Sequence, residues 1–155
     1  MDSSWTQVDM IKKTARRPLI FVGIFICSAV GIGNAFAQEM NTSAVLDGQT
    51  VAIHLEPRDI GCEKPLKIAI NKSFCFSATL SSTNAAWNKD LTLAKFDAQM
   101  PAHRHGMVTR PKIKASKTGE YLIEGVKLHM VGDWKITLDL LHGKSSAQVA
   151  IPLKL

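Results

Sequence analysis

The sequence predicts an all-β fold, an immunoglobulin-like antiparallel β-sandwich of about seven strands preceded by an N-terminal signal peptide. Apolar and polar residues alternate after position 48 far more often than apolar residues recur at helical spacing. Turn-forming residues divide these alternating stretches at short intervals, which is typical of a sandwich. A charge-free stretch, 18–38, follows a basic one and sets the first 37 residues apart from the rest.

The first 37 residues have the three-part layout of a secretory signal peptide. Four cations precede an apolar run, and Ala35-Phe36-Ala37 supplies small residues before a cleavage point. The densest apolar part, 19–33, is shorter than the roughly 20 residues that a spanning helix needs. We therefore expect cleavage after Ala37 and export to the periplasm. The alternative is an uncleaved anchor, residues 18–37, in the inner membrane.

The exported part divides into a polar lead, 38–48, and a sandwich domain, 49–155. The clearest strand is 134–140, where Trp134, Ile136, Leu138 and Leu140 share one side and polar residues share the other. By the same pattern we expect strands at 51–55, 74–80, 91–98, 112–115, 126–128 and 147–151. The turn signals between strands are Asp47-Gly48, Lys117-Thr118-Gly119, Val131-Gly132-Asp133 and His142-Gly143-Lys144.

Charge and composition exclude some classes of partner. Of the chain's 19 Lys and Arg and 13 Asp and Glu, the first 37 residues hold four and two, so the remainder carries a formal charge of +4. This excess is scattered, whereas nucleic-acid binding needs clustered cations interleaved with aromatic residues. The densest basic group alternates along one stretch, as on a solvated strand face: Arg110, Lys112, Lys114 and Lys117. We expect no nucleic-acid partner.

Two cysteines remain after export, Cys62 and Cys75. In an oxidising compartment they should form a disulfide, closing a loop of about 14 residues. The alternative is a thiolate metal ligand, but no Cys-x-x-Cys spacing is present and neither cysteine adjoins a histidine. The sequence therefore favours a structural disulfide.

Candidate metal ligands concentrate in residues 100–107, Met-Pro-Ala-His-Arg-His-Gly-Met. If this segment is extended, His103, His105 and Met107 lie on one face, and a loop or bulge could bring the donors together. Imidazole and thioether in an exported protein suggest copper, because thioether suits Cu(I) and imidazole suits both oxidation states. Zinc gains little from methionine, and harder ions need carboxylates that the segment lacks.

A purely structural interpretation of this segment stays open. Met100 is in phase with Phe96 and Ala98 and could fill the core, and Met107 could also be packing. Pro101 and Gly106 bracket the segment like a shaped bend, so the histidines could simply be turn residues.

A second candidate lies at His129, followed by Met130. In a regular strand these two side chains point to opposite faces, so at most one joins the first cluster unless the backbone turns there. Met130 is in phase with Val126 and Leu128, which predicts that it is buried. His54 is expected on a solvent face, and His142 begins a turn.

Two motifs, Met100-Pro101-x-His103-x-His105-Gly106-Met107 and His129-Met130-x-Gly132-x-Trp134, together resemble the YtkA-like and FixH-like extracytoplasmic domains. The resemblance covers roughly residues 65–153 and includes a Gly119-x-Tyr121 strand start between the motifs, with Arg104 where glycine is frequent and Val131 where proline is frequent. It implies an immunoglobulin-like sandwich with a part in copper handling or in assembling respiratory oxidases. The implied partners are a copper ion and a membrane-bound oxidase or copper-transport protein.

Two function classes follow from the sequence. In the first, the domain binds copper with His103 and His105 as the principal ligands, Met107 or Met100 supplying thioether, and His129 as a candidate third imidazole. In the second, it is a metal-free module whose loops dock on a membrane or respiratory complex. An enzyme is not expected, because no Ser or Cys nucleophile adjoins a histidine, no carboxylate pair stands out, and no glycine-rich phosphate loop is present.

Overall fold

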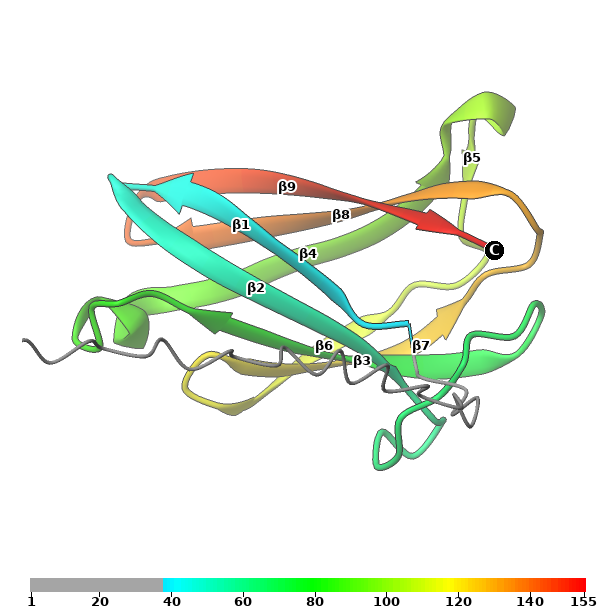
Figure 1. Ribbon diagram of the computed structural model, residues 1–155, viewed down its shortest axis with the longest axis horizontal. Helices are drawn as coiled ribbons and strands as arrows, with labels where there is room; N and C mark the ends of the chain where they lie inside the picture. The colour runs from blue at the N-terminus through cyan, green and yellow to red at the C-terminus, as the bar shows by residue number, and fades with distance from the viewer. Residues whose placement is uncertain (1–37) are drawn as a thin grey trace, which may run out of the picture. The chain divides into compact units, whose positions relative to one another are not determined.

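A computed structural model describes residues 38–155, and the expected signal peptide lies outside this described part. Two antiparallel sheets pack face to face, which confirms the predicted sandwich (Figure 1). Its strands are β1 (Met40–Leu46), β2 (Gln49–Arg58), β3 (Ser73–Ser81), β4 (Leu91–Met100), β5 (His105–Gly106), β6 (Lys112–Lys117), β7 (Glu120–Lys127), β8 (Asp133–His142) and β9 (Ser145–Lys154). Two short 3-10 helices, η1 (Trp87–Asp90) and η2 (Pro101–His103), flank β4.

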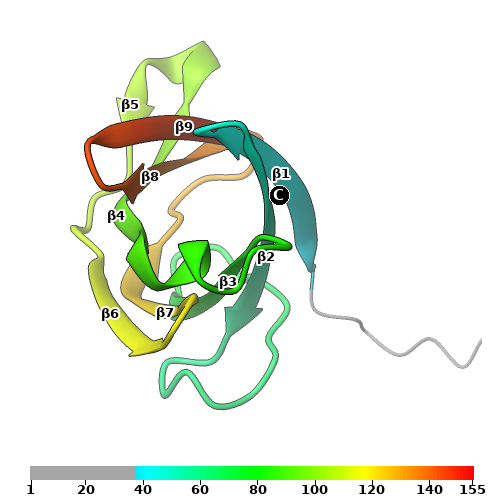
Figure 2. The same cartoon turned by 90° about the vertical axis from the view of Figure 1, so that its left-hand side faces the viewer.

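The two sheets contain five and four strands. One sheet runs β1-β2-β3-β7-β6 and the other runs β5-β4-β8-β9. β1 lies beside β9, so the two layers also meet along one side (Figures 1 and 2). Over residues 38–155 we find no helix with the length and apolar character needed to cross a membrane.

The core forms between the layers because each strand turns its apolar residues inward. Along β8 the buried positions are Trp134, Ile136, Leu138 and Leu140, as the alternation predicts. The layers are also joined by a buried hydrogen bond, in which the Tyr121 hydroxyl on β7 donates to the Leu91 carbonyl on β4 at 2.9 Å. The sandwich therefore has one continuous hydrophobic core.

The largest departure from the expected strands is β1. Residues 40–46 fall in the stretch that the sequence assigned to a polar lead, yet they pair with β2 along their whole length, from Met40 opposite Leu55 to Leu46 opposite Gln49. Met40 and Leu46 are buried, but the positions between them on the inner side are the small residues Thr42 and Ala44. This face is too weakly apolar to stand out as an alternating strand.

The predicted disulfide is present and joins Cys62 to Cys75, with their Cα atoms 5.4 Å apart. Cys75 lies on β3 and is buried, whereas Cys62 lies in the long connection between β2 and β3. The bond therefore fastens this connection to the five-stranded sheet.

The end of the sandwich at η1 is closed by a stacked aromatic pair. The Trp87 and His142 rings stack with centroids 4.1 Å apart, and Nδ1 of His142 lies 2.9 Å from the Asp47 carboxylate. Figure 2 looks at this end and shows η1 lying across it. Hydrogen bonds from the side chains of Ser145 and His142 lower the pKa of Asp47 below its usual 3.8. This contact ties the β1–β2 turn to the β8–β9 turn.

Loss of the disulfide should lower the stability of the domain. In the chain-entropy model a loop of this size is worth about 3 kcal/mol, so Cys62→Ser with Cys75→Ser should lower the free energy of unfolding by roughly that amount. Denaturant unfolding of the oxidised wild type and the double variant measures the difference. Equal midpoints would show that the bond adds nothing to stability.

The Asp47 contact predicts a pH-dependent stability. Because the pKa of Asp47 is lower in the folded state than in the unfolded state, its contribution is present above pH 3.8 and disappears as pH falls through the folded value. The Asp47→Asn variant should therefore have a lower melting temperature than wild type at pH 7, and the difference between the two melting temperatures should shrink towards pH 2. Thermal melts across this range test it, with Glu39→Gln, an exposed carboxylate, as the control.

Candidate functional site

Two loops at the opposite end of the sandwich carry the candidate ligands. The first is a tight hairpin that begins where β4 ends. β5 returns antiparallel to β4, with His105 opposite Met100 and Gly106 opposite Gln99. The η2 turn makes the reversal, and Arg104 ends it in the left-handed conformation, with φ of 53°. His103 and His105 are therefore not on one extended face, because the chain turns between them.

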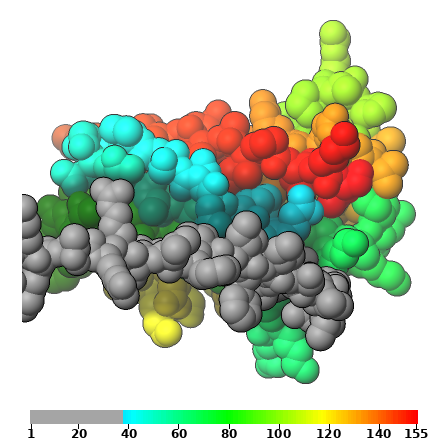
Figure 3. All heavy atoms as spheres, in the orientation of Figure 1, coloured from blue at the N-terminus to red at the C-terminus, as the bar shows by residue number. Residues whose placement is uncertain are grey.

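Pairing continues for one residue beyond β5. The Met107 amide donates to the Ala98 carbonyl at 3.1 Å, which holds Met107 beside β4. The hairpin tip projects beyond the body of the sandwich next to the β7–β8 loop (Figure 3). His103 is exposed on this tip, and His105 is half-buried below it.

The second loop, 128–132, connects β7 to β8 and carries His129. Two contacts fix its course. The Trp134 indole N–H donates to the Met130 carbonyl at 3.0 Å, and the amides and carbonyls of Gly132 and Leu155 exchange two hydrogen bonds of 3.0 and 3.1 Å. The backbone turns at this loop instead of continuing as a strand, which frees His129 to face the hairpin.

The two loops place three imidazole rings in a row. The centroids of His103 and His105 are 5.8 Å apart, and those of His105 and His129 are 5.2 Å apart. On its other side His129 meets the edge of the Trp134 ring at 5.7 Å. Nδ1 of His129 is buried and has no hydrogen-bond partner among the described residues. Such an unpartnered buried nitrogen normally costs free energy, which makes it a candidate ligand atom.

The sulfur atoms lie at different depths around this row. Met100 is 2% exposed and belongs to the core, as its phase with Ala98 predicts. Met107 is partly buried against the core. Met130 is 36% exposed, so the expectation that it is buried is wrong. The reason is that β7 ends at Lys127, and the strand phase does not extend to residue 130.

The spacing of the imidazole rings is compatible with metal binding, but the side chains do not already form a metal site. A metal–nitrogen bond of about 2 Å puts each ligated ring about 3 Å from the ion, so two rings on one ion lie roughly 5 to 6 Å apart. The observed spacings fall in this range. Within residues 38–155, however, no three or more His, Cys, Asp or Glu side chains already form a group that could hold an ion. Binding of one ion by the three histidines would therefore require their side chains to move from this arrangement.

Gly132, expected in a turn, also lies close to the Met100 side chain. Its φ is 130°, and a Cβ built there would lie 2.8 Å from the Met100 methyl carbon. The missing side chain therefore leaves room for the Met100 side chain beneath the loop. Trp134 was expected only as a core residue, and its indole N–H bond was not foreseen. The clue was the spacing His129-x-x-Gly132-x-Trp134.

Comparison with known proteins gives no relatives: neither a family model, nor a curated protein, nor a solved structure matches the chain.

Substitution of Gly132 should be costly because of its backbone conformation. Gly132→Ala should lower the free energy of unfolding by about 2 kcal/mol, since φ of 130° disfavours any side chain. The Met100 methyl carbon that a Cβ would meet is the end of a flexible side chain and can move aside at little cost. Gly143→Ala is the control, because its φ is 58° and nothing lies within 4 Å of a Cβ built there, and we expect it to cost about 1 kcal/mol. Equal losses in denaturant unfolding would contradict the extra backbone strain at Gly132.

Proposed function

We propose that the domain binds copper at the histidine row. The observation that carries the proposal is the meeting of three imidazoles from two separate loops, with the buried Nδ1 of His129 lacking any partner among the described residues. His105 and His129 would be the principal ligands because their rings are the closest pair. His103, exposed on the hairpin tip, would complete the set from the solvent side.

The donor types favour copper over other metals. Every candidate ligand here is an imidazole or a thioether, and residues 100–107 contain no carboxylate. Thioether is a soft donor that suits Cu(I), whereas Ca²⁺ and Mg²⁺ require several oxygen ligands. Met100 lies opposite His105 in the β4–β5 pair and Met107 follows β5, so these two residues are the candidate sulfur donors. Bound copper would be held for storage, buffering or delivery.

The cellular role in this proposal follows the resemblance to the YtkA-like and FixH-like domains. The signal-peptide layout of residues 1–37 would direct the domain to the periplasm, and the resemblance links it to copper handling or oxidase assembly. A membrane-bound oxidase or a copper-transport protein is the corresponding partner. The competing proposal is a metal-free docking module on such a complex, and copper titration distinguishes the copper-binding proposal from the docking proposal.

Copper titration tests the ligand assignment. Cu(I) and Cu(II) should bind wild type, and His105→Ala with His129→Ala should weaken binding at least 100-fold, because the closest imidazole pair is lost. His54→Ala with His142→Ala is the matched control, since these histidines bond to Asn41 and Asp47 instead. Competition with a chelator of known affinity measures each constant. The affinity for copper should also fall as the pH is lowered, because protons compete with copper for the imidazole nitrogens.

The methionines are tested separately. Met100→Leu with Met107→Leu should weaken Cu(I) binding more than Cu(II) binding, because only the soft donor is lost. Circular dichroism must confirm that every variant is folded. If wild type binds neither ion above background, or if the His105/His129 variant binds both as well as wild type, the copper proposal fails and the docking module is favoured.

A further inference from the structure

The four-stranded sheet ends at β5, on an edge that no other strand covers. β5 is first in the order β5-β4-β8-β9 and lies outside β4 in both views (Figures 1 and 2). The Met107 amide donates to the Ala98 carbonyl at 3.1 Å, so these two form a hydrogen-bonded pair. The next pair, Gly106 with Gln99, is then of the non-hydrogen-bonded kind, because the two kinds alternate along a ladder. The Gly106 N–H and C=O therefore point away from β4, towards the open edge.

The surroundings of Gly106 leave space for a further strand. Among the described residues, a Cβ built at Gly106 would meet only Ala98 and Gln99 of β4 within 4 Å. A glycine inside a strand often marks a place where another backbone approaches closely. Val108, two residues further on, is 66% exposed, so the same edge also presents an apolar side chain.

The other sheet edges are protected against a second copy of the chain. β6 carries Lys112, Lys114 and Lys117, and lysines on an edge strand oppose pairing between copies. β1 and β9 lie beside each other where the two layers meet. β5 contains neither lysine nor arginine. Over residues 38–155, the edge at β5 is therefore the one that lacks such protection.

Two copies of this edge are complementary to each other. If the two Gly106 residues lie opposite one another, each N–H donates to the other copy's C=O around a two-fold axis. In this antiparallel register, His105 of one copy lies opposite Met107 of the other. Directly opposite residues share one face of the sheet, with Cβ atoms about 5 Å apart. Met107 is half-buried and not enclosed in the core. Each His105 therefore gains a thioether neighbour from the second copy.

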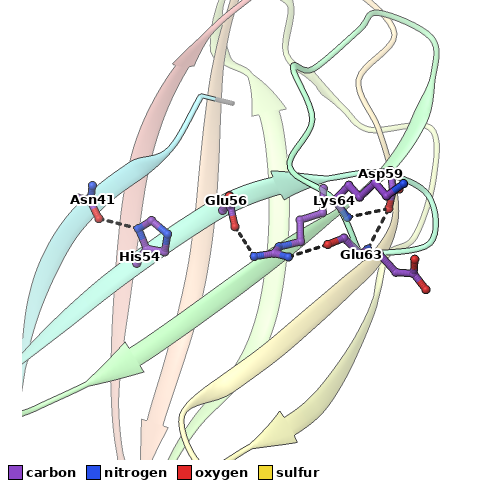
Figure 4. A network of polar contacts seen from close by, with 7 residues as sticks. Asn41, His54, Glu56, Asp59, Glu63 and Lys64 are labelled. Atoms are coloured by element: carbon purple, nitrogen blue, oxygen red, sulfur yellow. Dashed lines mark hydrogen bonds and ion pairs between the residues drawn. The ribbon is translucent and has the colours of Figure 1, made fainter. Parts of the chain in front are cut away.

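The candidate copper site of a single chain is short of donors. His105 and His129 are the closest imidazole pair, and no three or more His, Cys, Asp or Glu of the described residues already form a metal-binding group. Met100 is only 2% exposed and belongs to the core. His54 is engaged elsewhere, because its Nδ1 lies 2.8 Å from the Asn41 side-chain oxygen (Figure 4). A trigonal or tetragonal copper site needs more donors than this pair supplies.

We infer that copper joins two copies of this chain through β5, each ion being held by His105 and His129 of one copy and by Met107 of the other. The inference rests on the proposed copper site and names the chain that supplies its sulfur. β5 is two residues long, so the contact is far smaller than the interface of a stable dimer. The chain without copper is accordingly monomeric, and the bound ions hold the dimer together.

Sedimentation velocity of the purified chain tests the association. It should sediment as a monomer without metal and as a dimer once Cu(I) is added anaerobically to saturation. Amide hydrogen exchange, followed by NMR in the same samples, tests the contact. The Gly106 amide should exchange about tenfold or more slowly in the dimer, because it becomes hydrogen-bonded there. The Met107 amide is the control and should change less, since it already donates to Ala98.

Mixing two variants tests which chain supplies the sulfur. Met107→Leu keeps both histidines, and His105→Ala with His129→Ala keeps Met107. Neither variant alone should bind Cu(I) as tightly as wild type. An equal mixture should regain about one tight site for every two chains, because the second chain's thioether completes the first chain's histidine pair. The control is the histidine variant carrying Met107→Leu as well, whose mixture with Met107→Leu should regain none.

The outcomes separate this inference from the copper proposal. A copper-loaded monomer, a dimer that forms equally without copper, or no gain on mixing folded variants would overturn the inference and leave the copper site of the single chain standing. Gly106 exchange that copper does not slow would overturn the β5 contact. Absence of copper binding by wild type would refute the copper proposal and, with it, the inference.

Discussion

The antiparallel pairing of β4 with β8 determines both ends of this sandwich. Gln99 lies opposite Lys135 at one end of the ladder, and Leu91 lies opposite His142 at the other. Met100 and the hairpin after it are consequently next to the β7–β8 loop, although some 30 residues separate them in sequence. A slip of one residue would turn every inward side chain of β4 outward, so burial of Phe96 and Ala98 fixes the register.

The same ladder explains why each end has a tryptophan against a histidine. Trp87 precedes β4 and stacks on His142 at the end of β8, whereas Trp134 begins β8 and meets His129 with its edge. The two pairs differ in what surrounds them. His142 has a carboxylate partner in Asp47, and Nδ1 of His129 has none among the described residues. One histidine therefore has its hydrogen bond within the fold, while the other has a buried nitrogen without a partner in the described part of the chain.

Much of the fold was predictable because strand alternation is a local property. β8 was found almost completely, since its four inward residues are large and apolar. β1 was missed because its inward positions include Thr42 and Ala44, and only pairing with β2 reveals it as a strand. The predicted stretch 126–128 covered only the end of β7, which runs over Glu120–Lys127. The disulfide was predictable because residues 38–155 contain just two cysteines.

The candidate site was predictable in its residues but not in its geometry. Sequence spacing placed His103 and His105 on one face if the chain is extended, yet Arg104 adopts a left-handed conformation and the chain reverses there. The proximity of His129 to His105 depends on two features that sequence spacing does not reveal. One is the long-range register of β4 with β8, and the other is the hydrogen bond of the Trp134 side chain. Gly132 shows the same limit: its place in a turn was predictable, whereas its φ of 130° and its contact with Met100 depend on the folded structure. To predict a site assembled from two loops one therefore needs the register of the strands that carry them, and that register is set by the whole core.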